Sequence, residues 1–407
     1  MSQGNIINTG NPLDLAVEGE GYFVLSDGEK NTYTRSGSFA VDANSNLVDP
    51  ATGYLVQRIG SVGEIDGFQT TGINSINVPY DTAMAANATS SVTVAGNLSS
   101  DAMFTTPQTN VLKSDITFTT NGGTAATGAT DIDDLDQFTG AFSADTGTLT
   151  ISGYNHDGDA LLAGAGSLTL TVDATTDLDA VITKLNPVLS DAANLNADGS
   201  VDVASISNGH IVITDGASGY SRSDIKLAYT PGSDGESLTL PGYFEVSTVG
   251  GEEVKNASIT IYDSHGVSHS LSAAFVRTDT ANTWDIILTS ITGDINGITF
   301  DNRRINGIEF AASDGSYGGL SAVDADTAQF AVTFAHDTTN PQTIAIDLGT
   351  TGQFNGLTQF AGNSTAVARE QDGYEAGRLV SASVTHRCFL KWYQERHRYS
   401  TDCAISE

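Results

Sequence analysis

One short segment of the chain contains every residue type of a hydrolytic triad, namely Asp263, Ser264, His265 and His269. A triad needs a base within hydrogen-bond reach of the hydroxyl, and a carboxylate that orients the base. Residues 257–262 are predicted to form a strand, and neighbouring side chains of a strand point to opposite faces, so these groups do not converge easily. The order Asp-Ser-His-Gly is typical of a β-hairpin in which Gly266 adopts a positive φ. We therefore predict a turn here, and no catalytic site.

Three acidic segments place oxygen ligands close together, as calcium loops do: residues 42–49, 131–136 and 155–159. The first lacks the central glycine and the bidentate glutamate of an EF-hand loop. Asp and Asn side chains also stabilise turns by bonding their own backbone, so we predict solvated turns without a bound metal. Gly19 and Gly21 lack the third glycine of a dinucleotide loop and precede a predicted strand, and we expect no cofactor.

Composition excludes further classes of function. The chain has 49 acidic and 17 basic side chains and a net charge of −32. Such a surface repels nucleic acid and anionic lipid, because binding to either depends on Lys and Arg, so we expect neither as a partner. No run approaches the roughly 20 apolar residues of a membrane helix, and residues 1–11 lack the basic and apolar regions of a secretory signal. Cys388 and Cys403 are spaced like neither a zinc ribbon nor a redox pair.

The elements that must carry these segments are mainly β. Short runs of alternating apolar residues, separated by Gly, Asn and Asp, predict antiparallel strands. Examples are residues 22–25, 167–172, 210–214, 257–262 and 284–288. One helix is expected around residues 178–185, with Thr175 or Thr176 as its cap and Pro187 just beyond its end. Its expected apolar stripe comprises Leu178, Val181, Ile182 and Leu185.

Three groups of segments resemble the bacterial flagellar rod and hook family. The first comprises TGNPLDLAV, GEGYF and TRSGSF within residues 9–39. The second is YDSHG at residues 262–266, which is similar to the middle domain that separates hook proteins from rod proteins. The third comprises TQF at 358–360 and QDGY at 371–374. The signature positions are Asn11, Pro12, Asp14, Gly19, Gly21, Phe23, Arg35, Gly37, Phe39, Tyr262, Asp263, Ser264, Gly266, Gln359, Phe360, Gln371, Asp372, Gly373, Tyr374 and Gly377.

The resemblance and the strand pattern together imply a nested, mainly β, multidomain chain. The two chain ends, residues 1–85 and 340–384, are expected to build an inner β domain. Residues 86–113 and 239–339 are expected to form a middle β domain, and residues 114–238 an inserted outer α+β domain.

Two departures from the family pattern stand out. Hook proteins resemble one another in an amphipathic helix at each end, and this chain shows neither, so it resembles a member truncated of its terminal helices. Residues 385–407 form an atypical tail, rich in basic and aromatic residues, that we expect to be disordered. Back-translation of residues 389–393 can give the family's Phe-Ser-Asn-Gly one base later, and we hypothesise that the tail is read out of frame.

The resemblance implies a structural subunit of the flagellar hook, the curved tube that transmits torque from rod to filament. It implies an extracellular, non-enzymatic protein without cofactors, exported through the flagellar type III apparatus without a cleaved signal peptide. Its implied partners are other copies of itself in a helical tube, and the rod and hook–filament junction proteins. Two alternatives remain: a distal rod protein of the basal body, and a calcium-dependent secreted β-rich adhesin. Without terminal helices and with this charge, we expect the chain to be monomeric in dilute solution.

Overall fold

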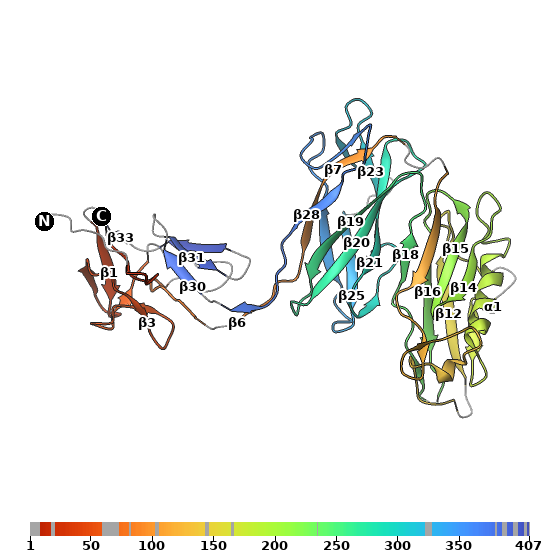
Figure 1. Ribbon diagram of the computed structural model, residues 1–407, viewed down its shortest axis with the longest axis horizontal. Coiled ribbons are helices and arrows are strands. Elements are labelled where there is room, and N and C mark those ends of the chain that lie inside the picture. Colours follow the sequence, from red (N-terminus) through yellow and green to blue (C-terminus); the bar gives the residue numbers. More distant parts are fainter. Residues whose placement is uncertain are drawn as a thin grey trace. The chain divides into compact units, whose positions relative to one another are not determined.

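The computed structural model divides the chain into two compact units (Figure 1). Unit 1 comprises Met1–Ala86 and Glu375–Glu407, and unit 2 comprises Asn87–Tyr374. The structure describes residues 9–17, 21–58, 73–80, 83–101, 106–142, 146–163, 167–233, 235–321, 328–378, 381–384, 389–393, 398–402 and 405–406.

Unit 1 is built on short antiparallel strands around a small apolar core. Its main sheet has the order β2-β1-β5-β4-β3, and β33 also pairs with β1. The strands are β1 (Tyr22–Ser26), β2 (Asn31–Thr34), β3 (Ala40–Val41), β4 (Leu47–Val48), β5 (Leu55–Val56) and β33 (Ile405–Ser406). Alternate residues of β1 point inward, because side chains of a strand alternate between its faces. The buried core comprises Leu13, Phe23, Leu25, Phe39, Leu47, Val56, Ile76 and Val78.

The C-terminal part of unit 1 is also β. Strand β6 (Ala83–Met84) pairs with β29 (Gly377–Arg378). The expectation of a disordered tail at residues 385–407 is corrected for its described residues. There β31 (Phe389–Tyr393) pairs with β32 (Arg398–Asp402), and β31 also pairs with β30 (Ser381–Val384), which precedes the tail. The run Phe-Leu-Lys-Trp-Tyr that makes up β31 is rich in aromatic residues, which favour strands.

Two sheets pack around one apolar core in the middle of unit 2. The first has the order β19-β20-β21-β23-β24, and the second has the order β22-β25-β26-β7-β27, with β28 also on β7. The first comprises β19 (Val254–Tyr262), β20 (Ser268–Arg277), β21 (Thr283–Ile291), β23 (Arg304–Phe310) and β24 (Tyr317–Leu320). The second comprises β7 (Ser91–Ser99), β22 (Ile295–Gly297), β25 (Gln329–Phe334), β26 (Gln342–Asp347), β27 (Leu357–Phe360) and β28 (Val367–Gln371). Trp284 and Phe330 are among its largest fully buried side chains.

The part of unit 2 that contains residues 114–238 lies at the other end of the unit (Figure 1). Its apolar core continues into the middle sheet, because the same buried cluster includes Ala274 and Val276 of β20 and Ile287 of β21. One sheet has the order β14-β15-β8-β18 and another the order β13-β12-β16. These strands are β8 (Thr109–Ser114), β12 (Gly147–Tyr154), β13 (Thr169–Val172), β14 (Val203–Ser207), β15 (His210–Ser218), β16 (Asp224–Thr230) and β18 (Phe244–Thr248). Smaller elements complete this part: β9 (Thr119–Thr120), β10 (Thr124–Ala125), the 3-10 helix η1 (Ile132–Asp134), β11 (Phe138–Thr139) and β17 (Ser237–Leu238).

Within the described residues the structure has one α-helix, α1 (Leu178–Leu189), which lies beside β14 (Figure 1). Its expected apolar stripe is present, with Leu178, Val181 and Leu185 buried. The expected cap was wrong: Asp177 is the N-cap, and its side chain accepts a hydrogen bond of 2.8 Å from the amide of Ala180. Pro187 lies inside the last turn and not beyond the helix.

Strand pairing corrects the expected domain boundaries. Residues 340–374 were assigned to the inner domain, but β26, β27 and β28 all pair with β7 inside unit 2. Strands β8 and β18 share a sheet with β15, so this outer part extends beyond residues 114–238. The chain enters and leaves it where Gln108 forms a bridge with Gly251.

Candidate functional site

In unit 1 the signature residues build a loop against β1. Asn11 donates from Nδ2 to Oδ1 of Asp14 over 3.0 Å, and its own Oδ1 accepts from the Leu13 amide over 3.2 Å. Asp14 Oδ1 also accepts from the hydroxyl of Ser38 at 3.3 Å. The Asn-x-x-Asp spacing therefore ties the loop to the segment around Ser38 and turns Leu13 into the core. Pro12 is exposed, and Gly19 lies outside the described residues.

The TRSGSF segment supplies the contact that closes this loop. The Leu15 amide donates to the carbonyl of Gly37 over 2.8 Å. A Cβ at Gly37 would lie 1.9 Å from the Leu15 oxygen and 2.8 Å from the ring of Phe23, so only glycine fits. The rings of Phe23 and Phe39 meet edge-on at 5.1 Å, a favourable aromatic geometry. The guanidinium of Arg35 lies over the Tyr22 ring, next to the half-buried Gly21.

In unit 2 the YDSHG segment is a hairpin turn, as predicted. Asp263 Oδ1 accepts from the amides of His265 at 2.9 Å and Val267 at 2.8 Å. Gly266 has a φ of 78°, the left-handed conformation that the turn requires. Burial raises the pKa of Asp263, but the hydrogen bonds from Val267, His269 and His265 outweigh it, and the net pKa is lowered.

A histidine cluster surrounds this turn. His269 Nε2 lies 3.2 Å from Asp263 Oδ2, while its Nδ1 lies 2.6 Å from the carbonyl oxygen of Thr292. His336 is 3.2 Å from the Ser264 hydroxyl through Nε2 and 3.6 Å from Asp263 Oδ2 through Nδ1. Serine, histidine and aspartate thus lie closer together than the sequence predicted, because β25 brings His336 to the hairpin. The 3.6 Å separation is too long for a hydrogen bond, and the Asp263 carboxylate already serves the turn and His269. This geometry suits a cross-link between loops and lacks the aligned base of a triad.

Two signature groups that lie far apart in sequence meet at Thr89, which is fully buried. The Thr89 hydroxyl accepts from the Tyr262 amide over 2.9 Å and donates to Gln371 Oε1 over 3.1 Å. Gln342 Nε2 donates to the carbonyls of both Thr89 and Tyr262, at 2.8 and 2.9 Å. A Cβ at Gly373 would lie 2.2 Å from the Thr89 hydroxyl, so this glycine allows the close approach. We refer to these five residues as the Thr89 junction.

Asp372 and Tyr374 extend the same junction. The Asp372 carboxylate accepts from the amides of Ser90 at 2.8 Å and Ser91 at 2.9 Å. Burial raises the pKa of Asp372, but the bonds from Ser90 and Ser91 outweigh it and lower the net pKa. Asn87 and Tyr374, the first and last residues of unit 2, exchange backbone hydrogen bonds of 2.9 and 3.0 Å. The junction therefore holds both chain crossings at the boundary of unit 2.

Three further signature residues lie apart from the junction. Gln359 is buried on β27, and its backbone amide donates to the Gly315 carbonyl over 2.8 Å. Phe360 is 46% exposed. Gly377 lies in β29 of unit 1.

A buried ionic cluster connects the outer part of unit 2 to its middle sheets. Arg303 Nη1 lies 3.1 Å from Asp224 Oδ1, and both side chains are buried. Arg303 also donates to the carbonyls of Phe244 at 2.8 Å and Leu288 at 3.1 Å. Burial raises the pKa of Asp224, against the opposing effect of Arg303. No local pattern predicted this cluster, because its charged partners lie 79 residues apart.

Next to it, the Tyr220 hydroxyl donates to Asp285 Oδ2, and the Gly307 amide donates to Asp285 Oδ1 over 2.9 Å. Burial raises the pKa values of both Tyr220 and Asp285 above their ordinary values. These contacts join β21 and β23 to the segment that precedes β16.

Carboxylates of the acidic segments accept hydrogen bonds from backbone amides. Asp42 Oδ1 accepts from the amides of Asn44 at 2.8 Å and Asn46 at 2.7 Å. Asp136 accepts from the Gly122 and Gly123 amides, both at 3.0 Å. In the part of the chain that the structure describes, no group of three or more His, Cys, Asp or Glu side chains is arranged to hold a metal ion. Among the same residues, no helix is long and apolar enough to cross a membrane.

A second buried pair joins a histidine to a carboxylate in unit 2. His156 Nδ1 lies 3.0 Å from Asp215 Oδ2. Burial lowers the pKa of His156, but the bond to Asp215 and the charges of Asp157 and Asp202 outweigh it and raise the net pKa. Burial also raises the pKa of Asp202, and it raises that of Asp115 to about 6.

We expect unit 2 to unfold at a lower temperature at pH 8 than at pH 5.5. The raised pKa of His156 gives stability that is complete below its unfolded value of 6.5 and is lost as pH rises through the folded value. The raised pKa values of Asp202 and Asp115 act in the same direction, because ionisation is less favourable in the folded state. Calorimetry across this range measures the effect, with His156→Gln as the matched variant. A pH slope that His156→Gln leaves unchanged would contradict the assignment to His156.

The fold and the signature residues define a β-rich structural protein, whose distinctive side chains hold turns, loops and chain crossings. Residues 16–100 match the family model of the flagellar hook protein FlgE/F/G D1 domain, and residues 246–374 match that of the flagellar basal body protein FlaE D2 domain. The chain belongs to the flagellar hook protein family.

Individual relatives match over short segments. The flagellar hook protein FlgE of Helicobacter mustelae is 36% identical over 111 residues, which is 24% of this chain and 24% of the relative. That of Brucella abortus is 42% identical over 77 residues, 19% of each chain. The flagellar basal-body rod protein FlgG of Agrobacterium fabrum is 36% identical over 81 residues, 20% of this chain and 24% of the relative. The matches thus span about a quarter or less of these relatives.

Among solved structures, the Helicobacter pylori flagellar hook protein FlgE2 aligns with a TM-score of 0.44 and 14% identity. The alignment covers 97% of this chain and 88% of that one.

Proposed function

We propose that this chain is a structural subunit of the flagellar hook, the curved tube that transmits torque from rod to filament. The observation that carries the proposal is the match to both hook-type domains, the D1 domain chiefly in unit 1 and the D2 domain in unit 2. The partners would be other copies of the chain in a helical tube, with rod and hook–filament junction proteins at its ends. The chain would act outside the cell, after export by the flagellar type III apparatus.

The Thr89 junction favours a role in which the chain transmits mechanical force. The chain passes between the units twice, at residues 86–87 and 374–375. Force carried along the backbone at either crossing enters unit 2 beside Asn87 and Tyr374, which bond to each other. Asp372 and Thr89 would then spread this force over β7, β19 and β28, because four hydrogen bonds that involve their side chains link these strands. A connection held by several hydrogen bonds suits a subunit that must bend repeatedly without local unfolding.

A role in chemistry is not supported by the same geometry. The carboxylates of Asp263 and Asp372 have lowered pKa values and accept backbone amides, so they are poor proton donors or acceptors near neutral pH. We propose that the chain is not an enzyme and uses no cofactor.

Deleting the coding sequence tests this function. We expect cells without it to assemble basal bodies that end at the rod, to lack hooks and to be non-motile, because the tube would have no subunit. Complementation with the intact gene provides the control. Hooks of normal length in the deletion strain would contradict the proposal, and loss of the distal rod itself would favour the rod alternative.

The adhesin alternative predicts a different response. Calcium-dependent modules gain stability from bound ions, because ligands that bind only the folded state raise its stability. We expect the same thermal unfolding temperature with and without calcium for a hook subunit.

A further inference from the structure

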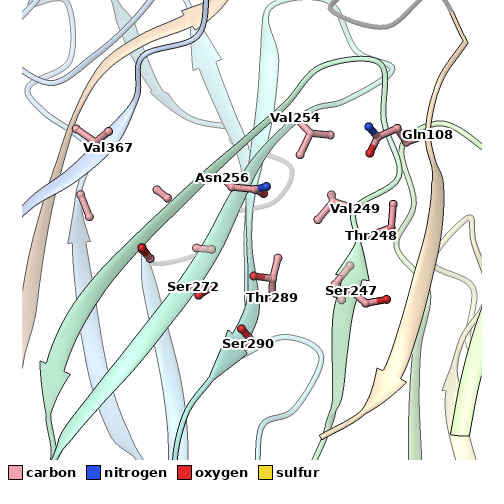
Figure 2. Close-up of a pocket in the computed structure, with 15 residues that line it drawn as sticks. Gln108, Ser247, Thr248, Val249, Val254, Asn256, Ser272, Thr289, Ser290 and Val367 are labelled. Atoms are coloured by element: carbon pink, nitrogen blue, oxygen red, sulfur yellow. The ribbon is translucent and has the colours of Figure 1, made fainter. Parts of the chain in front are cut away.

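Unit 2 has an open groove of about 810 Å³ where the outer part meets the middle sheets (Figure 2). Its walls come from β18, from the face of β19, β20 and β21, and from β28. Figure 2 shows Ser247, Thr248 and Val249 on one side, with Asn256, Ser272 and Thr289 on the other. The lining residues are Ser, Thr, Ala, Val, Asn and Gln, and none of them is ionisable. In a chain of net charge −32, this surface can meet another copy without direct repulsion between charged side chains.

A second surface of unit 2 carries two exposed aromatic side chains. Phe354 is 56% and Phe360 is 46% exposed, and their rings stack at 6.1 Å. We refer to these two residues as the aromatic pair. Exposed aromatic side chains of this kind dominate binding energy when a partner buries them.

The aromatic pair is fixed in place before any partner binds. The Phe360 backbone amide donates to Asn97 Oδ1 over 2.8 Å, and Asn97 Nδ2 donates back to the Phe360 carbonyl over 3.2 Å. A Cβ at Gly315 would lie 3.0 Å from the Phe360 ring and 2.2 Å from the Gln359 oxygen, so this glycine makes room for the strand and the ring. Asn355 bonds the backbone and hydroxyl of Thr350 at 3.0 and 3.1 Å, which closes the loop that carries Phe354. A rigid apolar surface loses less entropy on binding than a mobile one.

We propose that the aromatic pair of one copy docks into the groove of a second copy. The groove and the pair share no residue, so the contact is heterologous and leaves a free groove and a free pair on the two partners. Contacts of this kind propagate and form open helical assemblies when the rotation does not close. The inference rests on the proposed function, since it assigns a self-contact to the subunit of a helical tube.

Cysteine cross-linking tests the geometry. In a Cys388→Ser/Cys403→Ser background, one protein carries Ser258→Cys in the groove and another carries Phe354→Cys. We expect oxidation of the mixture to give a disulfide-linked dimer of one copy of each, and to give less dimer with either protein alone. As the control, Ser264→Cys in the YDSHG turn, outside the groove, replaces Ser258→Cys. Equal yields with the control, or dimers of the groove variant alone, would overturn the proposal.

Association strength provides the second measurement. We expect the intact chain to associate weakly as concentration rises, and Phe354→Ser/Phe360→Ser to weaken that association by about tenfold or more. Val267→Ser, which removes another exposed apolar side chain, should leave it unchanged. The double serine variant can also be expressed in the deletion strain. Normal hooks there would overturn this contact without contradicting the proposed hook function. Absent hooks from a variant that folds and is exported support the contact.

Discussion

Replacing Arg303 by Met is expected to lower the free energy of unfolding of unit 2 by about 3–5 kcal/mol. Arg303 is 1% exposed, and its loss leaves the buried carboxylate of Asp224 without its cation. It also leaves the carbonyls of Phe244 and Leu288 without a charged donor. Removing one partner of a buried ion pair costs more than removing both, because an unpaired buried charge remains. Denaturant unfolding measures the loss.

Two variants make the Arg303 result specific. Arg277→Met removes the same side chain from a pair with Glu252, whose side chain is 52% exposed, and should cost less than about 1 kcal/mol. Adding Asp224→Asn to Arg303→Met should restore part of the stability, because no buried charge is then unpaired. Equal costs for Arg303→Met and Arg277→Met would contradict a buried ionic link.

Gly37→Ala is expected to destabilise unit 1 by about 1–3 kcal/mol or more. The new Cβ would overlap the Leu15 carbonyl at 1.9 Å and press on the Phe23 ring at 2.8 Å. Either the bond between the Leu15 amide and the Gly37 carbonyl breaks, or Phe23 leaves its contact with Phe39. The core of this unit is small, so little other packing can compensate.

Hydrogen exchange reports this change locally. We expect the Leu15 amide and the amides of β1 to exchange faster in Gly37→Ala, while those of unit 2 keep their rates. Ser36→Ala is the matched control, because Ser36 is exposed and its hydrogen bond to the Thr34 hydroxyl comes from its backbone amide. Unchanged exchange at Leu15 would show that the loop tolerates the extra atom.

Local patterns in the sequence predicted much of this fold. The Asp263 turn, the strands around it and the apolar stripe of α1 depend on neighbours within a few residues. Such contacts repeat wherever the same residue types recur at the same spacing, so they can be predicted without knowing the topology. The prediction of the helix cap was wrong because several neighbouring residues, Asp173, Thr176 and Asp177, are all of types that cap helices, and Asp177 is the one that does so.

The convergence of distant residues could not be predicted in the same way. Thr89 meets Gln371 because β28 pairs with β7, and it meets Tyr262 because β19 of the other sheet packs beside β28. Arg303 and Asp224 gave no local signal, because charged residues in strands are usually solvated. The signature residues were singled out by resemblance alone, and their part in hook assembly remains a proposal.

The hook function is tested most directly by locating the protein in the flagellum. Antibody raised against this chain, detected by immunogold electron microscopy of intact flagella and hook–basal bodies, reports where the chain is incorporated. The account predicts gold particles along the hook, between the rod and the filament, and none in the deletion strain. Label confined to the rod, or spread over the cell surface without enrichment at hooks, would contradict it.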